Sequence, residues 1–374
     1  KLYGDRLPGG SDLVCYWFEK ARAMIEQKKC KRAGLLATQG IRGGLNRAVL
    51  DRIKASGNIF WAESDRAWIL DGAVVHVSMI GFDDGTETNY FLDGKSVTSI
   101  NSDLSSSFDL TLAKELSENA RISFIGTQKS GPFDLTEKQA KEMLAIQGNP
   151  NNRPNSDVVK PWINAIDVTQ SPRNMWVIDF GPNLAIEEAS KYDAPFEYVK
   201  AHVKPIRDRV RREAHKKKWW LFGDTRPGMR VALKSLSRYI ATPMVSKHRV
   251  FVWKSTSVIP ENLLVVIARN DDYFFGVLHS KLHELWARRK GSQLREAESG
   301  SRYTPTSTFE TFPFPWAPSK EPKNDPRVRA ISQAAKELVE QRDRWLKPES
   351  QVTVTLKVTV TSDEPKAAKK RTLT

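Results

Sequence analysis

The sequence has few cysteines and no hydrophobic run long enough to cross a membrane. Its 374 residues include only two cysteines, Cys15 and Cys30, and neither belongs to a CxxC pair. Two cysteines exclude a disulfide framework of the kind that stabilises small secreted domains, so a reduced cytoplasmic setting is the expectation. No apolar stretch approaches about 18 residues, and no signal-peptide pattern opens the chain, so we expect no membrane contact.

Motifs of several common enzyme classes are also absent. The chain contains no Walker loop and no recognisable Ser-His-Asp arrangement. His279 and His283 stand four residues apart in a helical pattern, which is a spacing of zinc ligands, but their neighbours are apolar and no third ligand lies nearby. We therefore predict that both histidines are structural and that the protein holds no metal.

The charge balance is strongly basic. Lysine and arginine number 59 against 44 aspartate and glutamate, which gives a net charge of +15 and an isoelectric point near 9.7. A protein this basic usually binds a polyanion, and nucleic acid is the first candidate, although a generically basic surface is the alternative. The eleven tryptophans fit the same partner, because flat aromatic rings beside cations can stack on bases.

The first hundred residues carry the pattern of an α/β sheet. Hydrophobic periodicity predicts a helix, a strand, a helix and two further strands, over residues 11–28, 33–38, 45–56, 58–62 and 74–82. We expect the last two strands to form an antiparallel pair. The polar segment 83–107 that follows is interpreted as a linker.

The pattern changes after the linker to short strands, turns and loops rich in proline and asparagine. Apolar runs predict strands over 175–181, 238–243, 249–253 and 263–269, and an amphipathic helix over 271–290. A second amphipathic pattern predicts a helix over 326–346. Residues 351–361 alternate strictly between apolar and polar, which indicates a strand without an obvious partner.

A series of motifs along the chain resembles a known family of enzymes. The motifs, in order, are SDLVCYWFEKA (11–21), GLLATQGIRGG with NR (34–47), VSMIGF (77–82), NRPNSDVVKPW (152–162), MWVIDFG (175–181), APFEYVK (194–200), KHRVFVW (247–253), DDYFFGVLHSKLHELW (271–286) and SRYTPTSTFETFPFP (301–315). They resemble the later motifs of amino-group DNA methyltransferases, and especially the adenine enzymes of the MmeI-like group. The resemblance extends to about residue 346, and it rests on the order and spacing of the motifs together.

The resemblance implies a fold and a division into domains. It implies an α/β fold, in which residues 1–104 form the rear half of a Rossmann-like methyltransferase sheet. Residues 105–318 would form an α+β target recognition domain, and residues 319–374 a C-terminal helix that acts as a connector, with a basic tail. Enzymes of the group are fused restriction–modification or phage-defence proteins, so the resemblance further implies a bacterial, cytoplasmic and nucleoid-associated protein with a fused or associated nuclease or defence module.

The resemblance also implies a reaction whose main parts lie outside this sequence. The family transfers a methyl group from S-adenosylmethionine to N6 of an adenine that is flipped out of double-stranded DNA. It holds the flipped adenine in an Asn/Asp-Pro-Pro-aromatic loop and the methyl donor at a glycine-rich turn after its first strand. The sequence contains neither and opens at Lys1 without an initiator methionine. We expect both upstream, so we expect no catalytic residue in this chain and no methyl transfer by the chain alone.

Three residues of the first domain align with family positions that surround the reacting groups. Leu13 and Trp17 align with positions that border the adenine ring of S-adenosylmethionine, and an apolar ledge beside a flat aromatic suits a purine face. Phe82 aligns with the aromatic that stacks on the flipped base. The alternative for all three is an ordinary place in the hydrophobic core.

Basic, polar and aromatic residues of the second domain are the candidates for DNA contact. Lysine and arginine can neutralise phosphates, whereas arginine and asparagine can read base edges in the major groove. The candidates are Arg153, Asn155, Lys204, Arg207, Arg211, Lys247, His248, Arg249, Arg302 and Tyr303. A solvated helix face is the alternative for the run between residues 200 and 220.

Two other functions stay open at this point. The first alternative is a stand-alone DNA recognition module without catalysis, which an Asn/Asp-Pro-Pro-aromatic loop immediately upstream would reject. An RNA methyltransferase is the second alternative, and a preference for structured RNA over duplex DNA would favour it.

Overall fold

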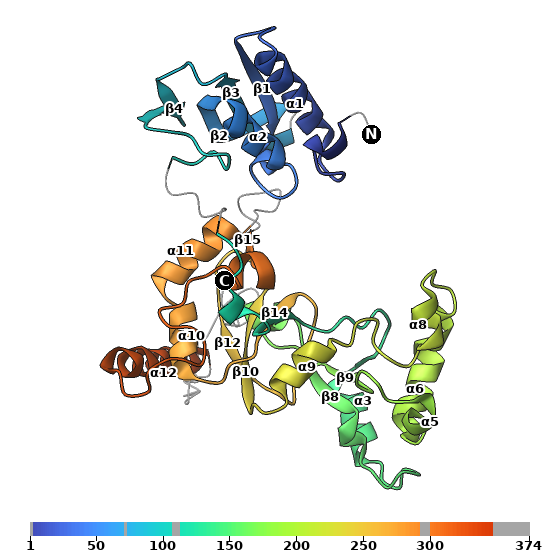
Figure 1. The fold of residues 1–374 in the computed structure, drawn as a ribbon. Coiled ribbons are helices and arrows are strands. Elements are labelled where there is room, and N and C mark those ends of the chain that lie inside the picture. The colour runs from blue at the N-terminus through green and yellow to red at the C-terminus, as the bar shows by residue number, and fades with distance from the viewer. Residues whose placement is uncertain (1–2, 71–72, 107–112, 292–299, 347–374) are drawn as a thin grey trace, which may run out of the picture. The chain divides into compact units, whose positions relative to one another are not determined.

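The computed structural model describes residues 3–70, 73–106, 113–291 and 300–346 and contains two compact units (Figure 1). Unit 1 comprises Lys1–Lys114 and Arg288–Ser301, and unit 2 comprises Glu115–Ala287 and Arg302–Thr374. Each unit has its own hydrophobic core. The alternating segment 351–361 lies outside the described residues.

Unit 1 has the predicted order of elements. It contains α1 (Leu13–Glu26), β1 (Arg32–Thr38), α2 (Ala48–Ser56), β2 (Asn58–Leu70), β3 (Ala73–Asp83), β4 (Tyr90–Leu92) and β5 (Lys95–Val97). The sheet order is β1-β3-β2-β4-β5, and β3 runs antiparallel to both of its neighbours. The antiparallel pairing of the last two predicted strands is therefore confirmed.

The segment interpreted as a linker is part of this sheet. Strand β4 pairs with β2 in parallel and with β5 in antiparallel orientation. Leu92, Ile100 and Leu104 are buried in the core of unit 1. The linker interpretation is wrong because these widely spaced apolar side chains anchor a segment that is polar on average.

A buried carboxylate joins the two helices of unit 1. Glu19 on α1 is fully buried and accepts hydrogen bonds from Arg22 at 2.9 and 3.0 Å and from Arg52 on α2 at 3.1 and 3.3 Å. Burial alone would raise the pKa of the Glu19 carboxyl, but the bonds from the two arginines outweigh it and hold the pKa below its ordinary value. The carboxylate therefore remains ionised and holds α1 against α2.

Unit 2 is built on two four-stranded sheets and a two-stranded pair. The first sheet has the order β12-β10-β14-β6, the second the order β13-β8-β9-β7, and β11 pairs with β15. The strands are β6 (Ser123–Ile125), β7 (Asp134–Leu135), β8 (Val159–Ile163), β9 (Trp176–Ile178), β10 (Arg238–Pro243), β11 (Val245–Ser246), β12 (Val252–Ser255), β13 (Ile259–Pro260), β14 (Leu264–Ile267) and β15 (Ser301–Arg302). Strands thus form within or beside all four predicted runs.

The helices of unit 2 are mostly short. They are α3 (Glu137–Ala145), α4 (Ile166–Thr169), α5 (Ile186–Ala189), α6 (Asp193–His202), α7 (Lys204–Arg207), α8 (Glu213–Lys217), α9 (Pro227–Leu233), α10 (Asp272–Leu278), α11 (Lys281–Lys290) and α12 (Pro326–Leu346). The predicted helix 326–346 is confirmed. The predicted helix 271–290 is two helices, because the Ser280 hydroxyl accepts a hydrogen bond from the backbone N–H of His283 and starts α11 afresh.

Two properties of the described residues bear on function. No helix among them combines the length and the hydrophobicity needed to cross a bilayer. No group of three or more His, Cys, Asp or Glu side chains comes together in the same part of the chain to hold a metal ion.

Both histidines of the zinc-like spacing are packed inside unit 2. His283 is fully buried, and its Nδ1 lies 2.9 Å from the Leu278 carbonyl while its Nε2 lies 3.1 Å from the Tyr303 hydroxyl. A carbonyl can only accept, so Nδ1 carries the proton and the Tyr303 hydroxyl donates to Nε2. Neither nitrogen of His283 is therefore available to a metal.

Candidate nucleic-acid interface

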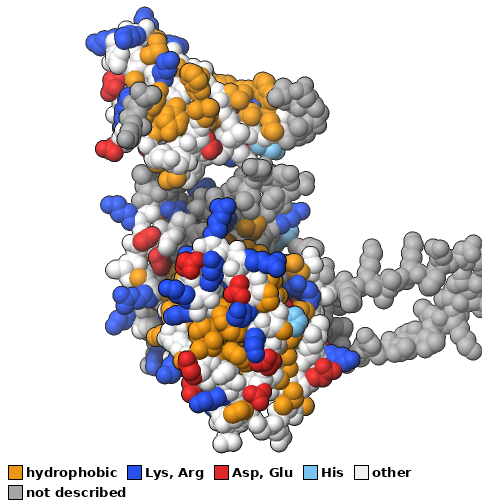
Figure 2. Space-filling view, turned by 90° about the vertical axis from the view of Figure 1, so that its right-hand side faces the viewer, with side chains coloured by type: hydrophobic (Ala, Val, Ile, Leu, Met, Phe, Trp, Pro, Cys, Tyr) orange, Lys and Arg blue, Asp and Glu red, His pale blue; other side chains and the backbone are white. Residues whose placement is uncertain are grey.

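Residues 209–218, which run from the end of α7 through α8, expose five cations that form no ion pair within the described part of the chain. Their side chains are exposed and make no ion pair or hydrogen bond within the described part of the chain; they are Arg209, Arg211, Arg212, Lys217 and Lys218. We call these five residues the free cation cluster. Figure 2 shows Lys and Arg side chains over the face of unit 2 that carries α6 and α8. Exposed cations of this kind can approach phosphates without first breaking an ion pair.

Neighbouring cations of the same segment are already paired. Lys200 binds Glu197 at 2.9 Å, Lys204 binds Asp208 at 2.9 Å, and Lys216 binds Glu213 at 2.9 Å. All three pairs are three or four residues apart on a helix, which is the spacing at which opposite charges meet. The predicted DNA contact of Lys204 stays a prediction. To bind a phosphate, the Lys204 ammonium would have to break its ion pair with Asp208 or bind Asp208 and the phosphate together.

Arg207 is buried, which contradicts its predicted contact with DNA. Its side chain has no exposed surface, and Nη2 donates to the backbone carbonyls of Lys129 at 2.8 Å and Leu221 at 3.1 Å. Burial lowers the pKa of the guanidinium from its ordinary value. Arg207 therefore joins two distant chain segments from inside the fold, and the prediction for it is wrong.

The two candidate base readers near residue 154 differ in exposure. Asn155 is buried, and its amide donates to the Met143 carbonyl at 2.8 Å and accepts from Asn149 at 2.8 Å. This amide is used inside the fold, so the predicted base contact of Asn155 is wrong. Arg153 is exposed and paired with Asp157 at 2.6 Å, and its contact with DNA stays a prediction.

A second exposed basic site surrounds the β11–β15 pair. Lys247 and His248 are exposed in the turn after β11, and Arg302 is exposed on β15. The backbone N–H of Tyr303 donates to the Met244 carbonyl at 2.7 Å, which brings the two segments together. Arg302, which is more than fifty residues away in sequence, is thus brought close to the segment of Lys247 and His248, and the roles of all three in DNA contact stay predictions.

Arg249 and Tyr303 lie below that surface. The Arg249 guanidinium donates to Thr242 Oγ1 at 3.1 Å and to the Pro243 carbonyl, and it lies 5.0 Å from the Tyr303 ring centroid. Burial lowers the pKa of Arg249 to about 10. Tyr303 is fully buried and donates its hydroxyl to His283, so it cannot reach DNA. The prediction for Tyr303 is wrong, whereas Arg249 is half-buried and its contact with DNA stays a prediction.

The three aligned residues of unit 1 differ in their exposure to solvent. Leu13 is 74% exposed and Trp17 56% exposed on α1, so the core alternative is wrong for both. The buried side of α1 carries Cys15, Phe18 and Ile25 instead. Phe82 is fully buried, and its ring stacks on Phe18 with a centroid distance of 5.9 Å. A ring enclosed in the core cannot stack on a flipped base, so the prediction for Phe82 is wrong.

Comparisons with known proteins match both units. The family model described as "MmeI, target recognition domain" matches residues 126–316, just over half of the chain. The solved structure of the type IIL restriction–modification enzyme MmeI in complex with DNA matches with a TM-score of 0.71 and 19% identity, over 93% of this chain and 47% of that one. At this identity the match shows the fold alone, and the chain spans about half the length of that enzyme.

Other comparisons add little. The type IIG restriction endonuclease BpuSI matches with a TM-score of 0.31 and 10% identity, over 89% of this chain and 45% of that one, and a likeness this weak carries no argument. No curated protein sequence matches the chain.

The match of the family model lies within unit 2 except for Arg288–Ser301, which belong to unit 1, and it includes the free cation cluster and the β11–β15 surface. The predicted α/β and α+β fold class and the resemblance to the MmeI-like group are both confirmed. The chain belongs to the family of proteins that carry the MmeI target recognition domain.

Proposed function

We propose that unit 2 binds duplex DNA and reads its sequence as the specificity element of a restriction–modification protein. The family match carries the proposal, since the matched residues form a target recognition domain. The free cation cluster supports it, because it gives that same domain five cations that can neutralise phosphates without losing an internal partner.

Salt-dependent binding of a duplex tests the phosphate contacts. Each neutralised phosphate contributes about −0.9 to the slope of the logarithm of affinity against the logarithm of salt concentration. The triple variant Arg209→Gln, Arg211→Gln, Arg212→Gln should therefore bind more weakly and with a slope shallower by about 2 to 3.

The chain offers a matched control for this experiment. The triple variant Lys191→Gln, Lys200→Gln, Lys216→Gln removes the same number of charges from the same part of unit 2, but from lysines that are paired with carboxylates. Equal losses in the two triple variants would show that binding depends on net charge alone and would count against a phosphate-contacting cluster.

We further propose that the parent protein transfers a methyl group from S-adenosylmethionine to N6 of adenine. When bound, S-adenosylmethionine supplies a methyl group attached to a positively charged sulfonium. The sulfur departs as a neutral thioether, so the transfer needs no metal to activate the leaving group. Leu13 and Trp17 suit a purine face because both are apolar, both are exposed, and they stand four residues apart on one side of α1. These two residues would hold the adenine ring of the donor by contact.

Transfer of labelled methyl to duplex DNA tests this second proposal. The comparison is between this chain and the protein extended upstream through the donor-binding and Asn/Asp-Pro-Pro-aromatic motifs. Activity of the extended form, reduced by Leu13→Ser or Trp17→Ser through a higher KM for the donor, is the expected result. DNA binding without transfer in either form would favour the stand-alone recognition module.

The proposed setting is a bacterial restriction–modification or phage-defence system in the cytoplasm, close to the nucleoid. A nuclease would be fused to the parent protein or associated with it. Cleavage of unmethylated DNA near the recognised sequence, and protection of the same DNA after methylation, is the expected behaviour of the complete system.

A further inference from the structure

Most arginines that unit 2 contributes to residues 126–316 are already engaged inside the protein. Arg207 is buried, and the half-buried Arg249 binds Thr242 Oγ1 and the Pro243 carbonyl. Six others are paired with a carboxylate; they are Arg153, Arg173, Arg226, Arg230, Arg238 and Arg269. In the described part of the matched domain, the exposed arginines of unit 2 without an ion pair are therefore Arg302 and the three of the free cation cluster.

The backbone beside Arg302 is firmly anchored. Arg302 lies on β15, which pairs with β11, and it is followed by the fully buried Tyr303. The Tyr303 backbone N–H donates to the Met244 carbonyl at 2.7 Å, and its hydroxyl donates to His283 Nε2 at 3.1 Å. The Tyr303 ring also packs edge-on against Phe251, with a centroid distance of 5.8 Å. Tyr303 thus fixes the position of β15 through both its backbone and its side chain.

This anchor determines the direction of the Arg302 side chain. Successive side chains of a strand point to opposite faces, so the inward Tyr303 directs Arg302 outward, and Arg302 is accordingly exposed. Its Nη2 lies 3.5 Å from the Met244 sulfur, which is a weak acceptor. The guanidinium therefore has a preferred position and keeps its charge for a partner outside the protein.

The arginines of the free cation cluster are held differently. Arg209, Arg211 and Arg212 lie in the segment between α7 and α8, which have only four and five residues. A cation in such a segment can neutralise a phosphate, because that contact requires charge and reach but no fixed orientation. Reading a base edge requires two donors aimed at two acceptors, which favours a side chain on an anchored strand.

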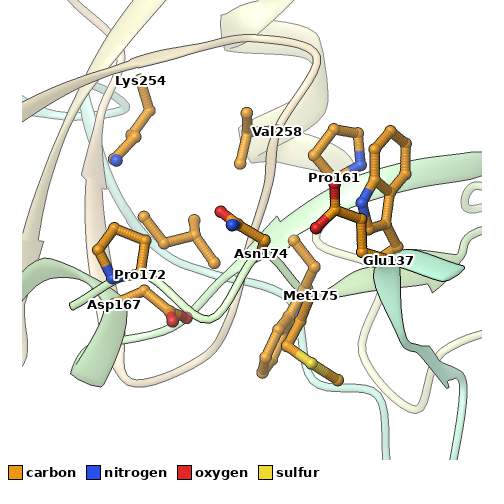
Figure 3. Close-up of a pocket in the computed structure, with 11 residues that line it drawn as sticks. Glu137, Pro161, Asp167, Pro172, Asn174, Met175, Lys254 and Val258 are labelled. Carbon is orange, nitrogen blue, oxygen red and sulfur yellow. The ribbon is translucent and has the colours of Figure 1, made fainter. Parts of the chain in front are cut away.

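Asparagine can also read base edges, and Asn174 is an exposed asparagine of unit 2. Its side chain lies in a hollow of about 270 Å³, which Pro161 and Met175 also line (Figure 3). A hollow can receive a projecting group, whereas a base reader must itself project into a groove of the duplex. Asn174 therefore suits this role less well than Arg302 does.

We propose that Arg302 reads a guanine in the major groove of bound duplex DNA. The proposal rests on the DNA recognition proposed for unit 2 and names a residue that determines its specificity. The guanidinium fork matches the O6 and N7 acceptors of guanine, and the major groove is wide enough for a two-stranded β pair such as β11–β15. Lys247 and His248, exposed in the turn after β11, would contact phosphates beside that guanine.

Selection of binding sites from random duplexes by the full chain tests this assignment. The wild type should enrich a motif that contains a guanine. Arg302→Ala should lose the preference for guanine at one position and bind the wild-type motif about 5- to 150-fold more weakly. Arg302→Gln should change the preference at that position to adenine, because a glutamine amide matches N6 and N7 of adenine.

Arg211→Ala is the matched control. It also removes one exposed arginine without an ion pair, but from the free cation cluster. If this cluster contacts phosphates, the variant should bind all sequences more weakly by a similar factor and should enrich the same motif as the wild type, because phosphates carry no sequence information.

The outcomes separate this inference from the proposed function. An unchanged motif in Arg302→Ala would make Arg302 at most a phosphate contact, and it would overturn base reading while sequence recognition by unit 2 stands. Loss of preference for a base other than guanine would overturn the guanine assignment. A wild-type protein that binds duplexes but enriches no motif would overturn sequence recognition itself, and with it the role of Arg302.

Discussion

Acidification should destabilise unit 2 through His283. The imidazole is fully buried, and burial is the main reason that its pKa falls from 6.5 to about 3. The unfolded chain takes up a proton near pH 6.5, whereas the folded chain does not until about pH 3. The contribution of His283 is therefore complete above pH 6.5 and is lost progressively as the pH falls toward 3.

The size of the effect follows from these two pKa values. Between pH 7 and pH 5 the unfolded state gains most of one proton and the folded state gains almost none. Linkage then gives a loss of about 2 kcal/mol in the free energy of unfolding from this residue alone. His279 adds to the loss in the same direction, because burial lowers its pKa to about 4.

Urea unfolding followed by tryptophan fluorescence at pH 7, 6 and 5 measures the effect. His283→Gln keeps a donor and an acceptor but does not titrate, so its stability should fall less between pH 7 and pH 5 than that of the wild type, by about 2 kcal/mol. A variant with the wild-type pH dependence would refute the assignment of the titration to His283.

Three further predictions concern packing. Glu19→Ala should lower the stability of unit 1 by about 1–3 kcal/mol in urea unfolding, because it removes the buried carboxylate that Arg22 and Arg52 share and leaves Arg22 paired with Glu26 alone. Gly126→Ala should cost about 1–3 kcal/mol, since an added Cβ would lie 2.2 Å from the Glu261 carbonyl oxygen, whereas Gly228→Ala meets nothing closer than 3.8 Å and should be tolerated. Arg207→Met should cost about 1–3 kcal/mol of stability and leave the salt slope of DNA binding unchanged, and a shallower slope in anisotropy titrations would restore a phosphate role for it.

The pairing of charges in the basic segment was partly readable from the sequence. Each of Lys200, Lys204 and Lys216 has a carboxylate three or four residues away, and these three are the paired lysines of the structure. Arg209, Arg211, Arg212 and Lys217 of the free cation cluster also have Asp208 or Glu213 three or four residues away, yet they form no ion pair with either. Spacing within one helix turn therefore shows which cations can pair, and only the structure decides which of them do.

Sequence spacing did not reveal that Arg207 of the same segment and Phe82 of unit 1 are buried. Arg207 has charged neighbours much like those of Arg209, yet its guanidinium binds carbonyls 78 and 14 residues away. Phe82 ends an apolar strand and stands beside a glycine, a pattern that suits a sheet edge or a core equally. Only the stacking of Phe82 on Phe18 of α1 shows that Phe82 lies in the core.

The sequence by itself determined the helices and strands of unit 1, the long C-terminal helix, the basic character and the family, because each depends on side-chain periodicity, composition or motif order along the chain. The tertiary structure alone decided which candidate side chains face solvent and which are used inside the fold. The reason is physical: burial and hydrogen-bond satisfaction depend on atoms contributed by distant segments, and no local pattern contains them.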